Sequence, residues 1–250
     1  NLDDIPNAFS DFEIDIEIPS NYFITSNLSE INSATLSNSK KVSLIASNKY
    51  DVSITLQPSN TYQTYKNEII EVSCGLEDNH LNDIEKAIIF DKITRFTASK
   101  LGKPLTNKIL ISQEDYLRQP FYGLNQLPSF LSPFPNDLIY ELKFLKTYLN
   151  NYLKENLNLN HRKDYWIYEG IQVYLMMQYA DEYFSNLKMT GNIAKLKLLK
   201  PYHFINLDFN QQYNYLYMLM ARKNLDQALN EPKNRLIKFN EQIASKYRAG

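Results

Sequence analysis

Residues 163–174 read Lys-Asp-Tyr-Trp-Ile-Tyr-Glu-Gly-Ile-Gln-Val-Tyr. Their spacing predicts a helix near residues 165–185. Aromatic residues at helical spacing more often line a core than a ligand site. Glu169 lies within this helix, and its simplest role is to pair with a Lys or Arg inside a helical bundle. The helical spacing is carried by Trp166, Gly170, Tyr174, Met177 and Ala180.

A second helix is expected upstream, near residues 136–155. Pro135-Asn136-Asp137 is a typical helix start, and apolar residues then recur at helical spacing. The helix would carry Lys146, Thr147 and Asn150 in its second half. Its apolar residues are Leu138, Leu142, Leu145, Leu149 and Tyr152.

Together the two segments resemble the active-site region of the aminopeptidase N family, which are thermolysin-like zinc peptidases of the gluzincin group. Residues 163–174 are similar to the family's Trp-Leu-Asn-Glu-Gly-Phe-Ala-x-Tyr, so the resemblance makes Glu169 the third zinc ligand. In the family, eighteen residues separate this Glu from an HExxH motif. The same count here places Lys146-Thr147-Tyr148-Leu149-Asn150 where the family has HExxH.

The replacements remove the chemistry of that motif. In HExxH, two His at i and i+4 bind one zinc ion, and the Glu between them activates the bound water. Lys146 places a cation at the first His position, Asn150 offers a neutral amide at the second, and Thr147 cannot act as a carboxylate base. We therefore predict a vestigial site without metal or other cofactor. We also expect the Lys146 ammonium to lie within about 4 Å of Glu169 and to neutralise it.

The resemblance extends upstream to Phe121–Pro128. This segment is similar to the family's Gly-x-Met-Glu-Asn strand, which lies beside the substrate and whose Glu holds the free amino terminus. Gln126 takes that Glu position, and an amide loses the charge-assisted contact to an ammonium. Four prolines hold the surrounding segment extended. The resemblance thus implies a degraded peptide groove along Gly123, Leu124, Asn125 and Gln126.

Downstream, Phe209–Met220 resembles the helix on which the family carries its transition-state Tyr. Tyr213 is the candidate for that position, and Tyr215 and Tyr217 serve the alignment equally well. Residues 9–75 are similar to the closing strands of the family's amino-terminal β-domain.

Composition excludes several classes of function. The chain has 250 residues, a formal net charge of -1 and no basic run, so nucleic acid is not an expected partner. No apolar run is long enough for a membrane-spanning helix. Cys74 is the only cysteine, and we expect it to be buried at a strand end. A metal site of His80, His161 and His203 is not expected either, since none of them is paired at i+3 or i+4.

The expected fold class is α+β: a β-rich domain over residues 1–75, then a thermolysin-like, mainly helical domain over residues 76–250, truncated at its carboxyl end. Alternating apolar residues predict strands, whereas residues 27–41 are rich in Ser and Asn and predict a loop. A helix is expected over residues 82–100, starting near residue 79, and a strand over residues 108–112. Further helices are expected near residues 188–199, 210–222 and 232–247.

These expectations point to a catalytically degenerate relative, a pseudoenzyme that acts as a binding or scaffolding module for an extended peptide or a partner protein. The chain is also similar to Bacteroidetes proteins that carry Tyr-Gly-Leu-Asn-Gln-Leu-Pro and Gly-Ile-Gln-x-Tyr-Leu-Met-Met without HExxH. That likeness implies a fragment of a periplasmic, cell-envelope or secreted protein. The sequence does not define an oligomeric state.

Two alternatives involve catalysis. The first is an active zinc-dependent aminopeptidase, for which Glu169 would still bind zinc. The second is a hydrolase in which Lys146 and Thr147 act as base and nucleophile. The second is disfavoured because adjacent residues on a helix point about 100° apart.

Overall fold

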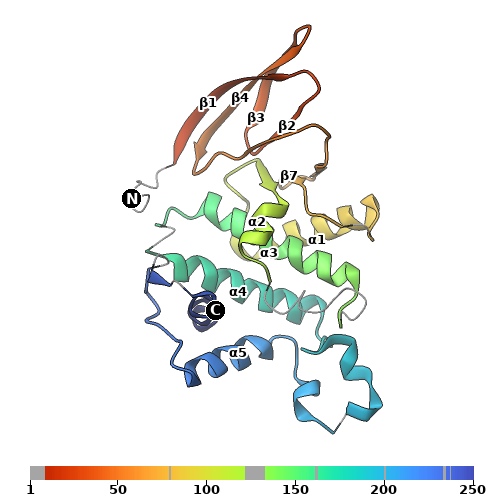
Figure 1. The fold of residues 1–250 in the computed structure, drawn as a ribbon, viewed down its shortest axis with the longest axis vertical. Helices are drawn as coiled ribbons and strands as arrows, with labels where there is room; N and C mark the ends of the chain where they lie inside the picture. The colour runs from red at the N-terminus through yellow and green to blue at the C-terminus, as the bar shows by residue number, and fades with distance from the viewer. Residues whose placement is uncertain are drawn as a thin grey trace. The chain divides into compact units, whose positions relative to one another are not determined.

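The computed structural model describes residues 9–78, 80–121, 133–160, 163–199, 201–232, 235–236 and 238–250 (Figure 1). Strands dominate the first part of the chain and helices the rest, so the predicted α+β class is confirmed. Contacts divide the chain into two compact units. We call Leu2–Pro120 with Thr147–Asn158 the sheet unit, and Phe121–Lys146 with Leu159–Gly250 the helical unit. The predicted boundary after residue 75 lies inside the sheet unit and stays a prediction.

The sheet unit begins with strands whose side chains alternate between core and solvent. One antiparallel sheet has the order β1-β4-β3, formed by β1 (Ser10–Pro19), β4 (Ser39–Lys49) and β3 (Ser29–Thr35). β2 (Phe23–Ser26) pairs antiparallel with β5 (Ile54–Gln57). Ile14 faces Leu44 and Ile16 faces Val42 across the β1-β4 pair. The predicted period-two pattern is thus confirmed, since these residues pack with Leu28 in one apolar cluster.

The predicted turn or exposed loop over residues 27–41 is wrong for residues 29–35 and 39–41, which form strands. Leu28 is buried, and the Ser- and Asn-rich residues after it form β3, which pairs with β4 and is exposed along its whole length. A strand that buries neither face needs no apolar alternation, because its backbone hydrogen bonds to β4 hold it in place.

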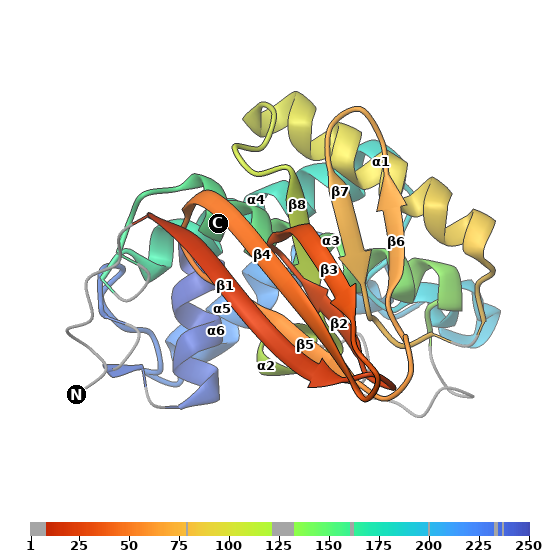
Figure 2. The same cartoon turned by 90° about the horizontal axis from the view of Figure 1, so that it is seen from above.

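A second three-stranded sheet follows, in the order β6-β7-β8, with β6 (Gln63–Lys66) antiparallel to β7 (Glu71–Cys74) and β7 parallel to β8 (Lys108–Ile111). Helix α1 (Asp83–Leu101) connects the two parallel strands and lies beside β6 and β7 (Figure 2). The Tyr65 ring stacks on Phe90, with centroids 5.6 Å apart. Asn82 caps α1 in a capping box with Glu85, so the helix begins at Asp83. Cys74 is buried at the end of β7, as predicted.

Two further helices complete this part of the chain. Sequence analysis did not predict the short α2 (Gln113–Arg118), although Ser112 and Asp115 form a capping box at its start. Helix α3 (Asn136–Asn156) matches the predicted helix, and all five of its predicted apolar residues are buried. It contributes residues to both units, which divide it between Lys146 and Thr147.

The helical unit also contains α4 (Tyr165–Tyr183), α5 (Gln211–Arg222) and α6 (Phe239–Ala249). α6 packs against α4 and α5 (Figure 1). α6 comes so close to α4 that a Cβ on Gly170 would lie 3.0 Å from the Ala249 Cβ. The predicted helices over residues 165–185 and 210–222 are confirmed. No described helix is long and apolar enough to cross a membrane.

Two predicted helical segments differ from the structure. Residues 188–199 form short 3₁₀ helices, η3 (Gly191–Lys195) and η4 (Lys197–Leu199), instead of one α-helix. Gly191 has a φ of 54°, which breaks a regular right-handed helix, and Leu198 is 86% exposed, so no core supports one. The helix predicted for residues 232–247 begins at Phe239 and continues to Ala249, because its carboxyl end packs against Gly170.

Candidate functional site

Lys146 is buried on α3 with only 4% of its surface exposed. Its ammonium Nζ donates a hydrogen bond to the Gln172 Oε1 on α4 over 2.7 Å. The Gln172 Nε2 in turn donates to the Lys146 carbonyl oxygen over 2.9 Å. Gln172 is therefore fixed from both ends, and its carbonyl oxygen faces a buried cation.

Glu169 lies one turn before Gln172 on α4 and is 3% exposed. The Tyr165 hydroxyl, one turn earlier still, donates a hydrogen bond to the Glu169 carboxylate. Burial raises the pKa of Tyr165 far above its ordinary value, and the negative charge of Glu169 adds to that shift. Residues at i, i+3 and i+4 share one face of a helix, so Tyr165, Glu169 and Gln172 form one buried polar stripe.

Two of the predicted site residues are connected through this stripe: Glu169 belongs to it, and Lys146 is hydrogen-bonded to Gln172. Lys146 contacts α4 through Gln172, one turn from Glu169. A direct Lys146–Glu169 ion pair stays a prediction. The sequence reasoning missed Gln172, although its i+3 spacing from Glu169 was a usable signal.

Thr147 and Asn150, the other two predicted site residues of α3, belong to the sheet unit. Thr147 is buried, and Asn150 is half-buried, with its Nδ2 3.4 Å from the Asn151 Oδ1. Asn151 donates to the Leu110 carbonyl oxygen over 2.7 Å. The side-chain amides of Asn150 and Asn151 thus form hydrogen bonds within the sheet unit.

Tyr213 lies in the first turn of α5 and is buried in an aromatic cluster. Its ring meets Tyr247 edge-on, with centroids 5.0 Å apart, and Phe121 at 6.4 Å. Its hydroxyl is enclosed and makes no hydrogen bond to any described residue. Burial raises the pKa of Tyr213 well above its ordinary value. Of the alternatives, Tyr215 is exposed and Tyr217 is half-buried.

The remaining candidates are scattered or undescribed. Gly123, Leu124, Asn125 and Gln126, the predicted peptide groove, lie outside the described residues, as does His161. His80 and His203 are both exposed. Among the residues that the structure does describe, no three His, Cys, Asp or Glu come together to hold a metal ion.

Sequence analysis also missed a second buried carboxylate on α3. Glu141 is 6% exposed and accepts a hydrogen bond from the Tyr179 hydroxyl of α4, inside the helical unit. The signal was present, because Glu141 interrupts the apolar stripe of α3 next to Leu142 and a buried carboxylate needs a donor. The two contacts Glu141–Tyr179 and Lys146–Gln172 show that α3 and α4 run antiparallel in the helical unit.

No protein-family model matches the chain, and a search of curated proteins found no match either. The search of solved structures did find similar backbones. The M1 zinc metallopeptidase from Deinococcus radiodurans is 10% identical, with a TM-score of 0.48 over 86% of this chain and 46% of that chain. A variant of this enzyme bound to a Tyr-Ser-Ala substrate is 12% identical, with a TM-score of 0.49 over 97% of this chain and 57% of that chain.

A third similar structure is a two-domain M1 zinc metallopeptidase variant bound to L-arginine. It is 10% identical, with a TM-score of 0.45 and the same coverage, 97% and 57%. The chain thus spans about half the length of the solved structures that it matches. Its backbone is similar to that part of the M1 zinc metallopeptidases.

Proposed function

We propose that this chain is a catalytically degenerate relative of the zinc aminopeptidases that binds an extended peptide or a partner protein without cleaving it. The proposal rests on the resemblance of residues 163–174 to the family's Glu-bearing helix and on the state of Lys146. The same resemblance supports a place in the cell envelope, as a periplasmic or secreted module. In this proposal the peptide lies along the segment from Gly123 to Gln126.

The hydrogen bond from Lys146 to Gln172 carries the proposal. A zinc ligand must offer a lone pair, whereas an ammonium offers only donors and repels a dication. The Gln172 Oε1, 2.7 Å away, accepts a hydrogen bond from the Lys146 ammonium and so stabilises the charged form of Lys146. To bind zinc, Lys146 would have to lose both its proton and this partner. The position is therefore suited to compensating the nearby Glu169 rather than to holding a metal.

The first experiment measures zinc and turnover together. Protein purified in added zinc is dialysed and its metal content determined by elemental analysis, while aminoacyl-anilide substrates report hydrolysis. We expect no stoichiometric zinc and no turnover above the buffer rate. Glu169→Gln serves as the matched variant, since it keeps the side-chain volume and removes the one remaining family ligand. Stoichiometric zinc and turnover that both disappear in Glu169→Gln would establish the active aminopeptidase instead.

A second experiment restores the family motif on α3. The triple variant Lys146→His, Thr147→Glu, Asn150→His places two imidazoles at i and i+4 with a carboxylate between them. If the chain descends from a zinc peptidase, this variant gains stoichiometric zinc, measured by competition with a coloured chelator. The same triple variant carrying Glu169→Gln should bind zinc at least about tenfold more weakly, because a catalytic site needs three protein ligands. Equal zinc binding by the two variants would contradict the proposal that Glu169 corresponds to the family's third zinc ligand.

Peptide binding and location need separate tests. A photo-crosslinking residue at Asn125 should capture extended peptides from a defined library, whereas one at the exposed Ile84 should not. Cell fractionation with an epitope tag tests the envelope assignment. Capture at both positions alike, or recovery in the cytosol, would contradict the respective part of the proposal.

A further inference from the structure

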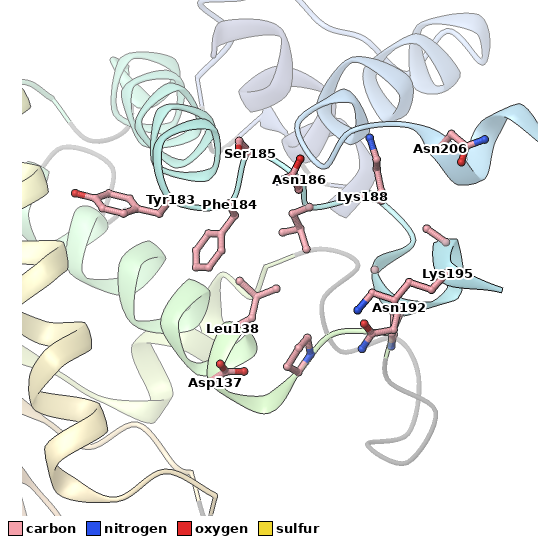
Figure 3. Close-up of a pocket in the computed structure, with 15 residues that line it drawn as sticks. Asp137, Leu138, Tyr183, Phe184, Ser185, Asn186, Lys188, Asn192, Lys195 and Asn206 are labelled. Atoms are coloured by element: carbon pink, nitrogen blue, oxygen red, sulfur yellow. The ribbon is translucent and has the colours of Figure 1, made fainter. Parts of the chain in front are cut away.

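A second candidate site lies in the helical unit, where the amino end of α3 meets the carboxyl end of α4. The cavity there has a volume of about 580 Å³ and is bounded by α3, the end of α4 and η3 (Figure 3). Pockets for small molecules are typically about 300–1,000 Å³. Leu138 on its wall lies eight residues before Lys146, which is about 12 Å along the helix. This cavity is thus separate from the positions that replace the zinc ligands.

The backbone that forms the cavity is held by hydrogen bonds. The backbone N–H of Asn192 donates to the Pro133 carbonyl oxygen over 2.6 Å, and the backbone N–H of Gly191 donates to the Lys188 carbonyl oxygen over 2.8 Å. Gly191 has a φ of 54°, and a Cβ at this position would lie 2.3 Å from the Pro133 oxygen. Only glycine permits this close approach of the two segments. The cavity is therefore built into the fold.

Opposite charges lie on different walls of the cavity. Asp137, in the first turn of α3, lies on one side, and Lys195, on η3, lies on the other next to Asn192 (Figure 3). Within the described part of the chain, neither Asp137 nor Lys195 forms an ion pair. A third charged residue, Lys188, is already paired with Asp208 at 2.5 Å. One carboxylate and one ammonium are thus left to meet a ligand.

Apolar groups line the wall between these charges. Phe184, at the carboxyl end of α4, lines the cavity together with Leu138, whereas the Tyr183 ring points away from them (Figure 3). The Phe184 ring packs on the fully buried Tyr179, with centroids 6.1 Å apart. An aromatic ring fixed in this way offers broad apolar area to a ligand.

We propose that this cavity binds a small zwitterion with an apolar or aromatic body, in the size range from a free amino acid to a dipeptide. Its ammonium pairs with Asp137, its carboxylate pairs with Lys195, and its side chains lie against Leu138 and Phe184. A simple anion would meet repulsion from Asp137, and a simple cation would meet repulsion from Lys195, so a ligand with both charges fits best. The inference does not depend on the proposed peptidase ancestry.

The test uses one dipeptide, L-phenylalanyl-L-alanine, and two blocked forms of it. The N-acetyl form lacks the ammonium, and the carboxamide form lacks the carboxylate. Binding to the full chain is measured by isothermal titration calorimetry, and we expect the free dipeptide to bind more tightly than either blocked form. Asp137→Asn should weaken the free and amide forms about two- to fivefold and leave the N-acetyl form unchanged. Lys195→Gln should weaken the free and N-acetyl forms by a similar factor and leave the amide form unchanged.

Further variants locate the site. Ala194→Phe places a ring in the cavity and should abolish binding while leaving the unfolding midpoint near that of the wild type. Lys197→Gln, on the neighbouring exposed η4, and Glu114→Gln, in the first turn of α2, are matched charge controls and should bind like the wild type. The proposal is overturned if the wild type shows no binding up to about 10 mM dipeptide. It is also overturned if the blocked forms bind as tightly as the free one, or if the controls weaken binding as much as the cavity variants do.

Discussion

Lys49 and Glu155 form a buried ion pair inside the sheet unit, with the Lys49 Nζ 3.3 Å from the Glu155 Oε2. Lys49 also donates to the Lys108 carbonyl oxygen, and Asn27 donates to the other Glu155 oxygen over 3.3 Å. Burial lowers the pKa of Lys49 and raises the pKa of Glu155. The charge of Glu155 opposes the shift of Lys49, and the charge of Lys49 opposes the shift of Glu155. Each charge is thus tolerated only because the other is present.

We therefore expect Lys49→Met alone to lower the free energy of unfolding by about 3–5 kcal/mol, because it strands a buried carboxylate. The double variant Lys49→Met, Glu155→Leu should recover most of that loss. Urea denaturation of the single and double variants measures the coupling. Lys66→Met is the control, because Lys66 is exposed and its partner Glu71 keeps a second cation, Lys108. A single variant within about 0.5 kcal/mol of the wild type would show that the pair is not buried in solution.

The same pair predicts a dependence on pH. A carboxyl group whose folded-state pKa is raised contributes stability below its unfolded pKa and loses that contribution as the pH rises through the folded pKa. The Lys49→Met variant lacks the positive charge that lowers the pKa of Glu155, so burial raises the pKa of Glu155 further than in the wild type. The stability of this variant relative to the wild type should therefore fall as the pH increases from about 4.5 to 7. Denaturation at several pH values tests the sign, and a difference that grows toward low pH would contradict it.

Two buried tyrosines provide a matched comparison of hydroxyl groups. The Tyr179 hydroxyl donates to Glu141, whereas the Tyr213 hydroxyl is enclosed without a hydrogen bond to any described residue. Tyr179→Phe should lower the free energy of unfolding by about 1–3 kcal/mol, since a buried carboxylate loses a donor. Tyr213→Phe should be neutral or slightly stabilising, because it removes an unsatisfied polar group. Equal losses in the two variants would refute this distinction.

At the scale of elements, the contact between α4 and α6 depends on Gly170. A Cβ there would lie 3.0 Å from the Ala249 Cβ and 3.1 Å from the Ala249 backbone. Gly170→Ala gains about 1 kcal/mol of helix propensity but crowds α6, so we expect a net loss of about 1–2 kcal/mol. Deleting residues 249 and 250 removes the crowded atoms, and in that shortened chain the same substitution should become stabilising. Thermal unfolding of the four proteins tests the change of sign.

Elements with a strong apolar period were predictable, and those without one were not. α3 was predicted within one residue, because its apolar stripe and its start signal agree. α1 matches the predicted range 82–100 within one residue, but it begins at Asp83 and not near residue 79. Ile84 and Ile88 are 74% and 62% exposed, while Ile89 and Phe90 are buried. More than one face of that helix carries apolar residues, and packing against the neighbouring strands determines which face is buried. β3 carries no apolar period, and its position depends on pairing with β4. The helix predicted near residues 188–199 does not form, because Gly191 makes a close contact there that a regular helix would not allow.

At the scale of the whole molecule, the proposed absence of zinc has a thermodynamic consequence. A resident metal stabilises the folded state by mass action, about 2.7 kcal/mol at a hundredfold excess over its dissociation constant. We expect incubation with EDTA to leave the unfolding midpoint of this chain unchanged, and the restored-motif variant to lose stability in the same assay. Differential scanning calorimetry measures both, and a chelator-induced drop in the wild type would contradict the proposed function.

The α+β class and the two helices that carry Lys146 and Glu169 could be predicted from the amino-acid sequence alone. These follow from local periodicity and residue chemistry, which need no knowledge of distant contacts. Three features depend on tertiary packing: Lys146 binds Gln172, Tyr213 is enclosed among aromatic rings, and a cavity opens beside Asp137 and Lys195. Such pairings join residues far apart in the chain, and packing selects them from many partners that the local pattern allows equally.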